Sequence, residues 1–164
     1  LNYLKEFLPF IKRAGATGIL VEYDDFFPYK NDLEAIKNQN HYTKQELQLF
    51  FKLAKEAELT IVPLVQTLNN LEFSLKLKQY TSLRQSKAYF GSINPCLNET
   101  YDKLIYRLLD QVIDAHPADL EYVHIGCSQL KSIDLNSDEC KHLNLKSIED
   151  LFIQGGWISS DIVV

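Results

Sequence analysis

Apolar residues follow two different spacings along the chain, and the two spacings alternate. Helical spacing predicts amphipathic helices over residues 2–14, 44–57, 71–77 and 99–115. Continuous apolar runs predict buried strands over residues 18–23, 59–65 and 120–125, with a weaker strand end at 92–95. Strands that alternate with helices in this way form parallel sheets. The sequence therefore predicts an α/β fold.

Local signals place several helix ends. Residues 43–46 read Thr-Lys-Gln-Glu, which matches a capping box, and Asn98 is expected to cap the helix that follows it. Pro9 is expected to kink or break the first helix, because it lacks an N–H and its ring clashes with the preceding turn. A last helical pattern begins at residues 147–150, and the glycines at 155–156 are expected to stop it.

Composition and charge exclude several classes of protein. The chain has 164 residues, 46% of them hydrophobic, which is enough for one domain with a core. Its net charge is −5, and it has no run of Lys and Arg that could neutralise phosphates, so we expect no nucleic-acid partner. No apolar run reaches the roughly 18 residues that cross a bilayer, so we expect no membrane association.

The cysteines and histidines carry little chemistry of their own. Cys96, Cys127 and Cys140 are odd in number and irregularly spaced, which predicts unpaired thiols and a reducing, intracellular compartment. Cys140 and His142 match no four-ligand zinc spacing, so no metal is expected. The acceptor pattern for N-glycosylation occurs at residues 98–100, but a three-residue pattern often arises by chance.

Each predicted strand is followed by polar residues that could form a site. In a parallel sheet the carboxyl ends of the strands share one edge, so these side chains are expected to meet there. Carboxylates and amides bind hydroxyl groups, and aromatic rings stack on sugars, so the edge suits a neutral polyhydroxylated ligand. The alternative is that the acids and amides are turn residues. The polar groups are Glu22, Asp24 and Asp25, then Gln66, Asn69 and Asn70, then His124, Ser128 and Gln129, with Tyr23, Phe26, Phe27 and Tyr29 nearby.

Several blocks in order and in register resemble one known family. Residues 15–29, 61–67 with 71–73, 94–95 and 122–127 are similar to blocks of the intracellular β-N-acetylhexosaminidases of glycoside hydrolase family 20. The resemblance covers roughly residues 3–155. It implies a (β/α)8 barrel, which needs about 250 residues. The chain would supply the N-terminal half of that barrel, without its first strand and its C-terminal βα units.

The resemblance also implies a domain organisation and a compartment. Residues 1–155 would form the partial barrel, and residues 156–164 would be a divergent tail. Missing neighbours would expose apolar strand edges and helix faces, so the isolated chain is expected to be marginally stable or prone to aggregation. The compartment expected from the family is the cytoplasm or the nucleus.

The resemblance further implies a substrate-assisted, retaining hydrolysis of terminal β-linked N-acetylhexosamine from carbohydrates or glycoconjugates, with no cofactor. In the family, an Asp orients the substrate's acetamido group, and the adjacent Glu protonates the departing oxygen. The matching positions here hold Ser128 and Gln129. The residues that would shape the sugar pocket are Glu22, Asp25, Gln66, Asn70 and His124.

The departures from the family pattern predict a weak or inactive chain. Gln129 has no proton to give, which removes general acid catalysis worth about 10²–10⁴-fold. Ser128 cannot stabilise a developing cation, and Asn70 stands where the family has an active-site His. Asp24 in place of the usual Glu is a milder change. The alternatives are a non-catalytic sugar-binding or interaction remnant, and a different reaction that uses other residues.

The four histidines divide by position. The resemblance makes His124 part of the hydrogen-bond network of the site, which is compatible with a satisfied core histidine. His41, His116 and His142 are expected at the surface or at helix caps.

Overall fold

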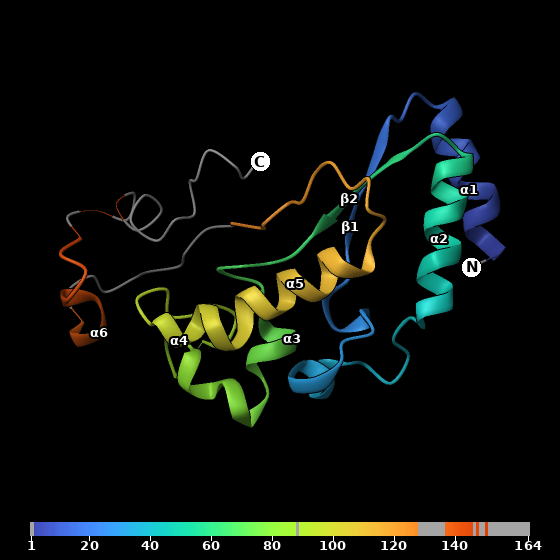
Figure 1. Cartoon of the computed structure of the whole chain (residues 1–164). Helices are drawn as coiled ribbons and strands as arrows, with labels where there is room; N and C mark the ends of the chain where they lie inside the picture. The colour runs from blue at the N-terminus through green and yellow to red at the C-terminus, as the bar shows by residue number, and fades with distance from the viewer. Residues whose placement is uncertain (1, 88, 128–136, 146, 148–149, 151–164) are drawn as a thin grey trace.

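The computed structural model describes residues 2–87, 89–127, 137–145, 147 and 150 (Figure 1). The α-helices are α1 (Asn2–Arg13), α2 (Lys44–Glu56), α3 (Glu72–Leu75), α4 (Asn98–Thr100), α5 (Tyr106–Ala115) and α6 (Asp138–Lys141). The strands are β1 (Gly18–Glu22) and β2 (Thr60–Leu64). Three short 3-10 turns, η1 (Asp24–Phe26), η2 (Asn31–Ile36) and η3 (Lys78–Leu83), and a π-helical turn, η4 (Tyr101–Ile105), complete the described elements.

The expected break at Pro9 is wrong, because α1 runs without interruption from Asn2 to Arg13. A proline removes one hydrogen bond from a helix interior, which costs stability. Packing offsets this loss: Leu8 is buried and shares a cluster with Ala54 of α2 and with Leu59. Figure 1 shows α1 and α2 side by side beyond one end of the two strands. Tertiary contacts therefore maintain the helix through an unfavourable residue.

The sheet is parallel, as predicted, but its third strand is much shorter than expected. β1 and β2 pair in register from Gly18 opposite Thr60 to Glu22 opposite Leu64. Of the strand predicted over residues 120–125, only His124 is bridged, in parallel, to Leu64. Its backbone N–H donates to Pro63, and its carbonyl accepts from Val65. The prediction is therefore right about direction and wrong about extent.

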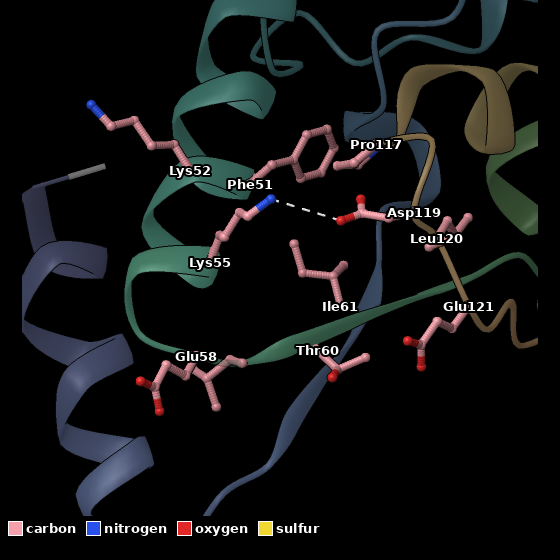
Figure 2. Close-up of a pocket in the computed structure, with 11 residues that line it drawn as sticks. Phe51, Lys52, Lys55, Glu58, Thr60, Ile61, Pro117, Asp119, Leu120 and Glu121 are labelled. Atoms are coloured by element: carbon pink, nitrogen blue, oxygen red, sulfur yellow. Dashed lines mark ion pairs between the residues drawn. The ribbon is translucent and has the colours of Figure 1, made fainter.

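The third segment fails to pair further because it diverges from β2 toward the amino edge of the sheet. A cleft of about 410 Å³ separates the two there, between α2, the start of β2 and residues 117–121. Figure 2 shows Lys55 on α2 reaching across to Asp119, with a distance of 3.7 Å between Nζ and Oδ2. Both charged and apolar side chains line this cleft, among them Glu58, Glu121 and Ile61.

The predicted helix at residues 99–115 exists as one helical run, α4–η4–α5, that includes a π turn. Asn98 does not cap it: Leu97 is the N-cap residue, without a side-chain capping bond, and Asn98 is already helical. The run ends at His116, as expected. The capping box of α2 is confirmed, since Thr43 and Glu46 exchange side-chain and backbone hydrogen bonds.

The weak strand end predicted at residues 92–95 reduces to one bridge, in which Ile93 lies antiparallel to Arg84. The short helix predicted at 71–77 is α3, which is only one turn long. Helix α6 was not predicted. Ser147 and Asp150 exchange hydrogen bonds, as at a helix start, but the rest of the last helical pattern and the residues at 155–164 lie outside the described part of the chain.

The main core lies between the sheet and the helices. Its fully buried members include Leu33, Leu68, Leu75, Leu104 and Leu108, which come from loops and helices widely separated in the sequence. A second cluster joins α1 to α2. Some apolar side chains remain uncovered: Leu20 of β1 is 55% exposed and Tyr122 is 44% exposed.

The prediction of three unpaired cysteines is wrong. Cys96 and Cys140 form a disulfide, and both are buried beside Leu143 and Leu145. Cys127 is free. Sequence spacing could not show this pairing because the residues are 44 positions apart and meet only through the fold. None of the helices in the described part of the chain combines the length and apolar character that crossing a bilayer requires.

Candidate active site

The carboxyl edge of the sheet brings the side chains of Glu22 and Gln66 together beside the third strand segment. Glu22 is the last residue of β1, and Gln66 follows β2 by two residues. The Gln66 Nε2 donates a hydrogen bond of 2.5 Å to Glu22 Oε1. His124 lies next to β2 through its bridge to Leu64. The predicted meeting at one edge is confirmed for the side chains of Glu22 and Gln66, and the backbone of His124 lies beside the same strand.

The side chain of Gln66 is buried, with 8% of its surface exposed, and its second amide atom is unsatisfied. Within the described ranges, Oε1 is a buried oxygen that has no hydrogen-bond partner. A Cβ built on Gly126 would lie 2.6 Å from this oxygen, so only glycine leaves room for the amide. Gly126 also has a φ of +53°, which other residues rarely adopt. The amide is thus held between the end of β1 and the third segment.

His124 has a defined ring orientation. Its Nδ1 accepts a hydrogen bond of 3.0 Å from the backbone N–H of Gly126. In the neutral ring the proton therefore resides on Nε2, which makes that nitrogen the donor. This hydrogen bond is compatible both with a histidine of the site's hydrogen-bond network and with a purely structural histidine.

Thr67 fixes the third segment to β2 and was missed by the sequence analysis. It is fully buried, and its Oγ1 donates to the carbonyl of Ile125 at 2.5 Å. The same hydroxyl lies 3.6 Å from Cys127 Sγ. Burial raises the pKa of the Cys127 thiol, so it stays protonated at neutral pH. A thiol in that state is a weak nucleophile, which favours a structural role for Cys127.

Carboxylates accumulate around Asp24. Burial is the largest cause that raises the pKa of Asp24 to about 6, and the charges of Glu22, Asp25 and Glu72 contribute in that order. The Asp24 backbone has a φ of +46°, so the predicted turn role and the predicted site role apply to the same residue. Asp25 forms an ion pair of 3.2 Å with Lys76. The acids that the sequence places at this edge therefore lie close enough together to affect the pKa of Asp24.

A second group of polar residues extends the site toward residues 89–92. Asn69 is buried, and its Oδ1 accepts from the Ser92 hydroxyl at 2.8 Å and from the Tyr89 hydroxyl at 3.3 Å. Tyr89 also lies 3.5 Å from Glu72 Oε1. Glu72 lies in the block at residues 71–73 that resembles the family, but the sequence did not predict it as a site residue. Tyr89 has no sequence signal, and Ser92 was identified only as the start of a weak strand end, with no role in the site.

The expected aromatic lining is largely wrong. Tyr23, Phe27 and Tyr29 are at most 4% exposed and belong to the core. Phe26 is 42% exposed and packs near Tyr42, with ring centroids 6.3 Å apart. The sequence predicts these rings near the sheet edge, but around the 3-10 turn η1 the chain turns Tyr23, Phe27 and Tyr29 into the core. In this group, only Phe26 presents a face to solvent.

His116 caps a helix, as predicted, but it is not a surface residue. Its Nδ1 lies 2.6 Å from the Val112 carbonyl, and its Nε2 lies 3.0 Å from the Tyr23 hydroxyl. Nδ1–H therefore donates to the carbonyl while Nε2 accepts from the tyrosine. Burial lowers the pKa of His116 and keeps it neutral. Burial, with a smaller contribution from Tyr42, raises the pKa of Tyr23 well above its usual range.

Of the remaining predicted site residues, Asn70 is described by the structure, whereas Ser128 and Gln129 are not. Asn70 is exposed and has a φ of +58°, at the point where the chain turns into α3. Ser128 and Gln129 lie outside the described residues, so the geometry of the family acid positions stays a prediction. Across the described ranges, no group of three or more His, Cys, Asp or Glu residues is arranged to hold a metal ion.

Comparison with known proteins identifies the chain's relatives. Hexosaminidase D from Bos taurus is 35% identical over 128 residues, which cover 78% of this chain and 36% of that protein. Hexosaminidase D from Homo sapiens is 35% identical over 130 residues, covering 79% of this chain and 26% of that protein. The chain is hexosaminidase D-like. It spans between a quarter and about a third of the length of these relatives.

Solved structures agree on the fold of this hexosaminidase D-like chain. A β-N-acetylhexosaminidase from Bacteroides fragilis matches with a TM-score of 0.66 and 16% identity, covering 93% of this chain and 35% of that one. No protein-family model matches the chain. The two hexosaminidase D relatives confirm the resemblance to β-N-acetylhexosaminidases that the sequence blocks predicted, and the solved structure shows the fold alone.

Proposed function

We propose that this hexosaminidase D-like chain forms part of a (β/α)8 glycoside hydrolase barrel whose carboxyl edge binds a terminal β-linked N-acetylhexosamine. Hydrolysis of the glycosidic bond is proposed to be weak or absent in the chain itself. The observation that carries the proposal is the hydrogen bond between Gln66 and Glu22, which joins the ends of two neighbouring strands beside His124. Active sites of parallel α/β barrels are assembled at this edge from several strand ends.

The chemistry of the edge supports a carbohydrate ligand. Glu22, Asp25 and Asn70 offer carboxylate and amide groups with exposed or partly exposed side chains, and sugar hydroxyls both donate to and accept from such groups. The exposed ring of Phe26 is available for stacking. The relatives of the chain are named for activity on hexosaminides, which agrees with this ligand class.

The proposed loss of activity comes from the residue types at the two acid positions. Substrate-assisted hydrolysis needs a carboxylate to orient the acetamido group and a carboxylic acid to protonate the leaving oxygen. Ser128 and Gln129 can hydrogen-bond a sugar, but neither can supply a charge or transfer a proton at neutral pH. Asn70 replaces a third expected group. Binding can therefore persist where turnover does not.

A direct assay separates activity from binding. The chain is incubated with chromogenic β-N-acetylglucosaminide and β-N-acetylgalactosaminide, with Gln129→Ala as the matched variant. We expect no turnover above the variant. Turnover that Gln129→Ala abolishes would show that the chain is a working glycosidase. Combining Ser128→Asp, Gln129→Glu and Asn70→His in the full-length protein tests whether these three positions alone limit hydrolysis.

The second candidate is a non-catalytic carbohydrate-binding protein, which the three substituted positions favour. An N-acetylhexosamine thiazoline mimics the cyclised intermediate of substrate-assisted hydrolysis and therefore probes the pocket without needing turnover. We expect it to bind, and we expect Glu22→Ala to weaken binding, because that change also removes the acceptor for Gln66. The absence of binding would leave an interaction remnant as the remaining function.

A further inference from the structure

We propose that the exposed ring of Phe90 stacks on the sugar that carries the terminal N-acetylhexosamine, so that the chain binds an oligosaccharide rather than a hexosamine on an apolar group. Phe90 is 45% exposed and lies in the segment that leads from η3 to α4. The inference rests on the proposed function, because it adds a second sugar position beside the edge proposed for the first. It concerns binding and does not depend on the acid positions.

Arg84 holds the ring of Phe90 from one face. Its guanidinium carbon lies 5.5 Å from the centre of the ring, which is within the range of a cation–π contact. Its Nε and one terminal nitrogen both donate to the carbonyl of Leu75, the last residue of α3, at 2.9 and 2.5 Å. The cation is therefore fixed to a helix end, and it orders the ring that lies against it. Covering a ring that is already ordered costs less conformational entropy than ordering a mobile one.

The backbone that carries Phe90 is fixed to the loop that follows β2. The backbone N–H of Leu71 donates to the carbonyl of Gly91 at 2.9 Å, and the N–H of Ile93 donates to the carbonyl of Leu68 at 3.1 Å. This loop begins at the carboxyl end of β2, where the proposed sugar-binding edge lies. Phe90 therefore has a fixed position beside that edge.

Glu72 connects the acids at the end of β1 with the residues around Phe90. Its charge contributes to the raised pKa of Asp24, so the two carboxylates are close together. Its Oε1 also lies 3.5 Å from the hydroxyl of Tyr89, the residue before Phe90. A Cβ built on Gly91 would overlap this oxygen and lie 2.7 Å from the Tyr89 hydroxyl, so only glycine leaves room for both groups. A line of polar groups thus leads from the edge of the sheet to Phe90.

The polar groups near Phe90 favour a sugar over an apolar ligand. A pyranose presents C–H bonds on its face and hydroxyl groups around its rim, so it suits an aromatic ring with hydrogen-bonding groups beside it. Such groups lie in or next to the same segment: the hydroxyl of Tyr89, the Glu72 carboxylate that it contacts, and the exposed Lys87. A long apolar ligand would need a larger contiguous apolar patch. The occupant that fits Phe90 is therefore a second sugar.

Titration calorimetry on the whole chain tests the proposal with three ligands that share a terminal β-N-acetylhexosamine and resist hydrolysis through a sulfur linkage. They are the disaccharide with N-acetylglucosamine as its second sugar, the methyl thioglycoside and the octyl thioglycoside. We expect the disaccharide to bind about tenfold more tightly than the methyl thioglycoside, which is the scale of one aromatic stacking contact. Equal affinities for these two ligands would overturn the proposal. A gain for the octyl thioglycoside alone would assign the ring to an apolar ligand and would also overturn it.

Variants show whether Phe90 itself causes the difference. Phe90→Ala and Phe90→Leu should both remove the advantage of the disaccharide and leave the affinity for the methyl thioglycoside unchanged, whereas Phe90→Trp should retain it. The leucine variant keeps an apolar side chain for packing while it removes the flat ring. Phe10→Ala is the matched control, because Phe10 of α1 is 59% exposed and no cation lies over its ring in the described part of the chain. A Phe90 variant that keeps the advantage, or that weakens both ligands equally, contradicts the proposal.

The same titrations distinguish this proposal from the proposed function. Binding of the methyl thioglycoside or of an N-acetylhexosamine thiazoline without a gain for the disaccharide overturns only the sugar position at Phe90. The absence of binding by all of these ligands overturns the sugar-binding edge and the Phe90 position together. Proton NMR gives an independent readout, because the ring current of Phe90 should move the C–H signals of the second sugar upfield. Phe90→Leu should abolish this shift, and a shift that persists in the variant would contradict the stacking.

Discussion

Replacing Asp24 by asparagine should stabilise the protein, and only at pH values where Asp24 is charged. The folded state raises the pKa of this carboxyl from its usual 3.8 to about 6, through burial and the neighbouring acids. The rise corresponds to about 3 kcal/mol at 1.36 kcal/mol per pKa unit. Neighbouring atoms partly desolvate the Asp24 carboxyl, but the residue as a whole is exposed, so solvent screening reduces the expected effect to about 1 kcal/mol.

The sign follows from proton binding. The folded state of a group with a raised carboxyl pKa binds more protons than the unfolded state between about pH 4 and 6, so stability falls as the pH rises through this window. Above about pH 6 the full cost of the charge is present. The substituted asparagine would carry no charge and would tolerate the φ of +46° at this position.

Urea unfolding followed by circular dichroism measures the effect at pH 7.5 and at pH 3.5. We expect Asp24→Asn to gain about 1 kcal/mol at pH 7.5 and close to nothing at pH 3.5. Asp110→Asn, on an exposed face of α5, is the matched control and should be neutral at both pH values. An equal gain at both pH values would assign the effect to the backbone. A loss at pH 7.5 would refute the reasoning from the acidic cluster.

Three further changes test the packing around the site. Gly126→Ala should cost about 2 kcal/mol or more by thermal unfolding, because the new Cβ meets the Gln66 amide and the φ is positive; a neutral result would contradict the proposed position of that amide. Tyr23→Phe should cost about 1–3 kcal/mol, because the buried Nε2 of His116 loses its donor, and an unchanged midpoint would contradict the hydrogen bond. Thr43→Ala should cost about 1 kcal/mol through loss of the capping box, which a helix-specific loss of hydrogen-exchange protection would check.

The elements that were predicted correctly are those fixed by local chemistry. The capping box at Thr43 and Glu46 needs only residues three apart, and it forms as expected. The apolar runs identify β1 and β2 as strands, but the burial predicted for them is wrong in extent, because most of their residues are only partly buried and Leu20 of β1 is 55% exposed. The meeting of Glu22 and Gln66 follows from parallel topology, which their strand spacing implies.

The errors arise where distant contacts override local signals. Pro9 stays within α1 because the neighbouring Leu8 packs against Ala54 of α2, and Cys96 meets Cys140 only in the folded chain. His116 caps α5 as predicted, but its burial and its hydrogen bond to Tyr23, 93 positions away, have no sequence pattern that could show them. Tyr89 and Ser92 join the site through Asn69, a contact that the weak strand signal starting at Ser92 could not show.

The most direct test of the proposed function is to titrate the chain with an N-acetylhexosamine thiazoline while hydrolysis of a chromogenic β-N-acetylhexosaminide is followed on the same sample. The account predicts saturable binding that Glu22→Ala weakens, together with no hydrolysis above the Gln129→Ala variant. Hydrolysis that depends on Gln129, or a chain that binds no thiazoline at all, would contradict it.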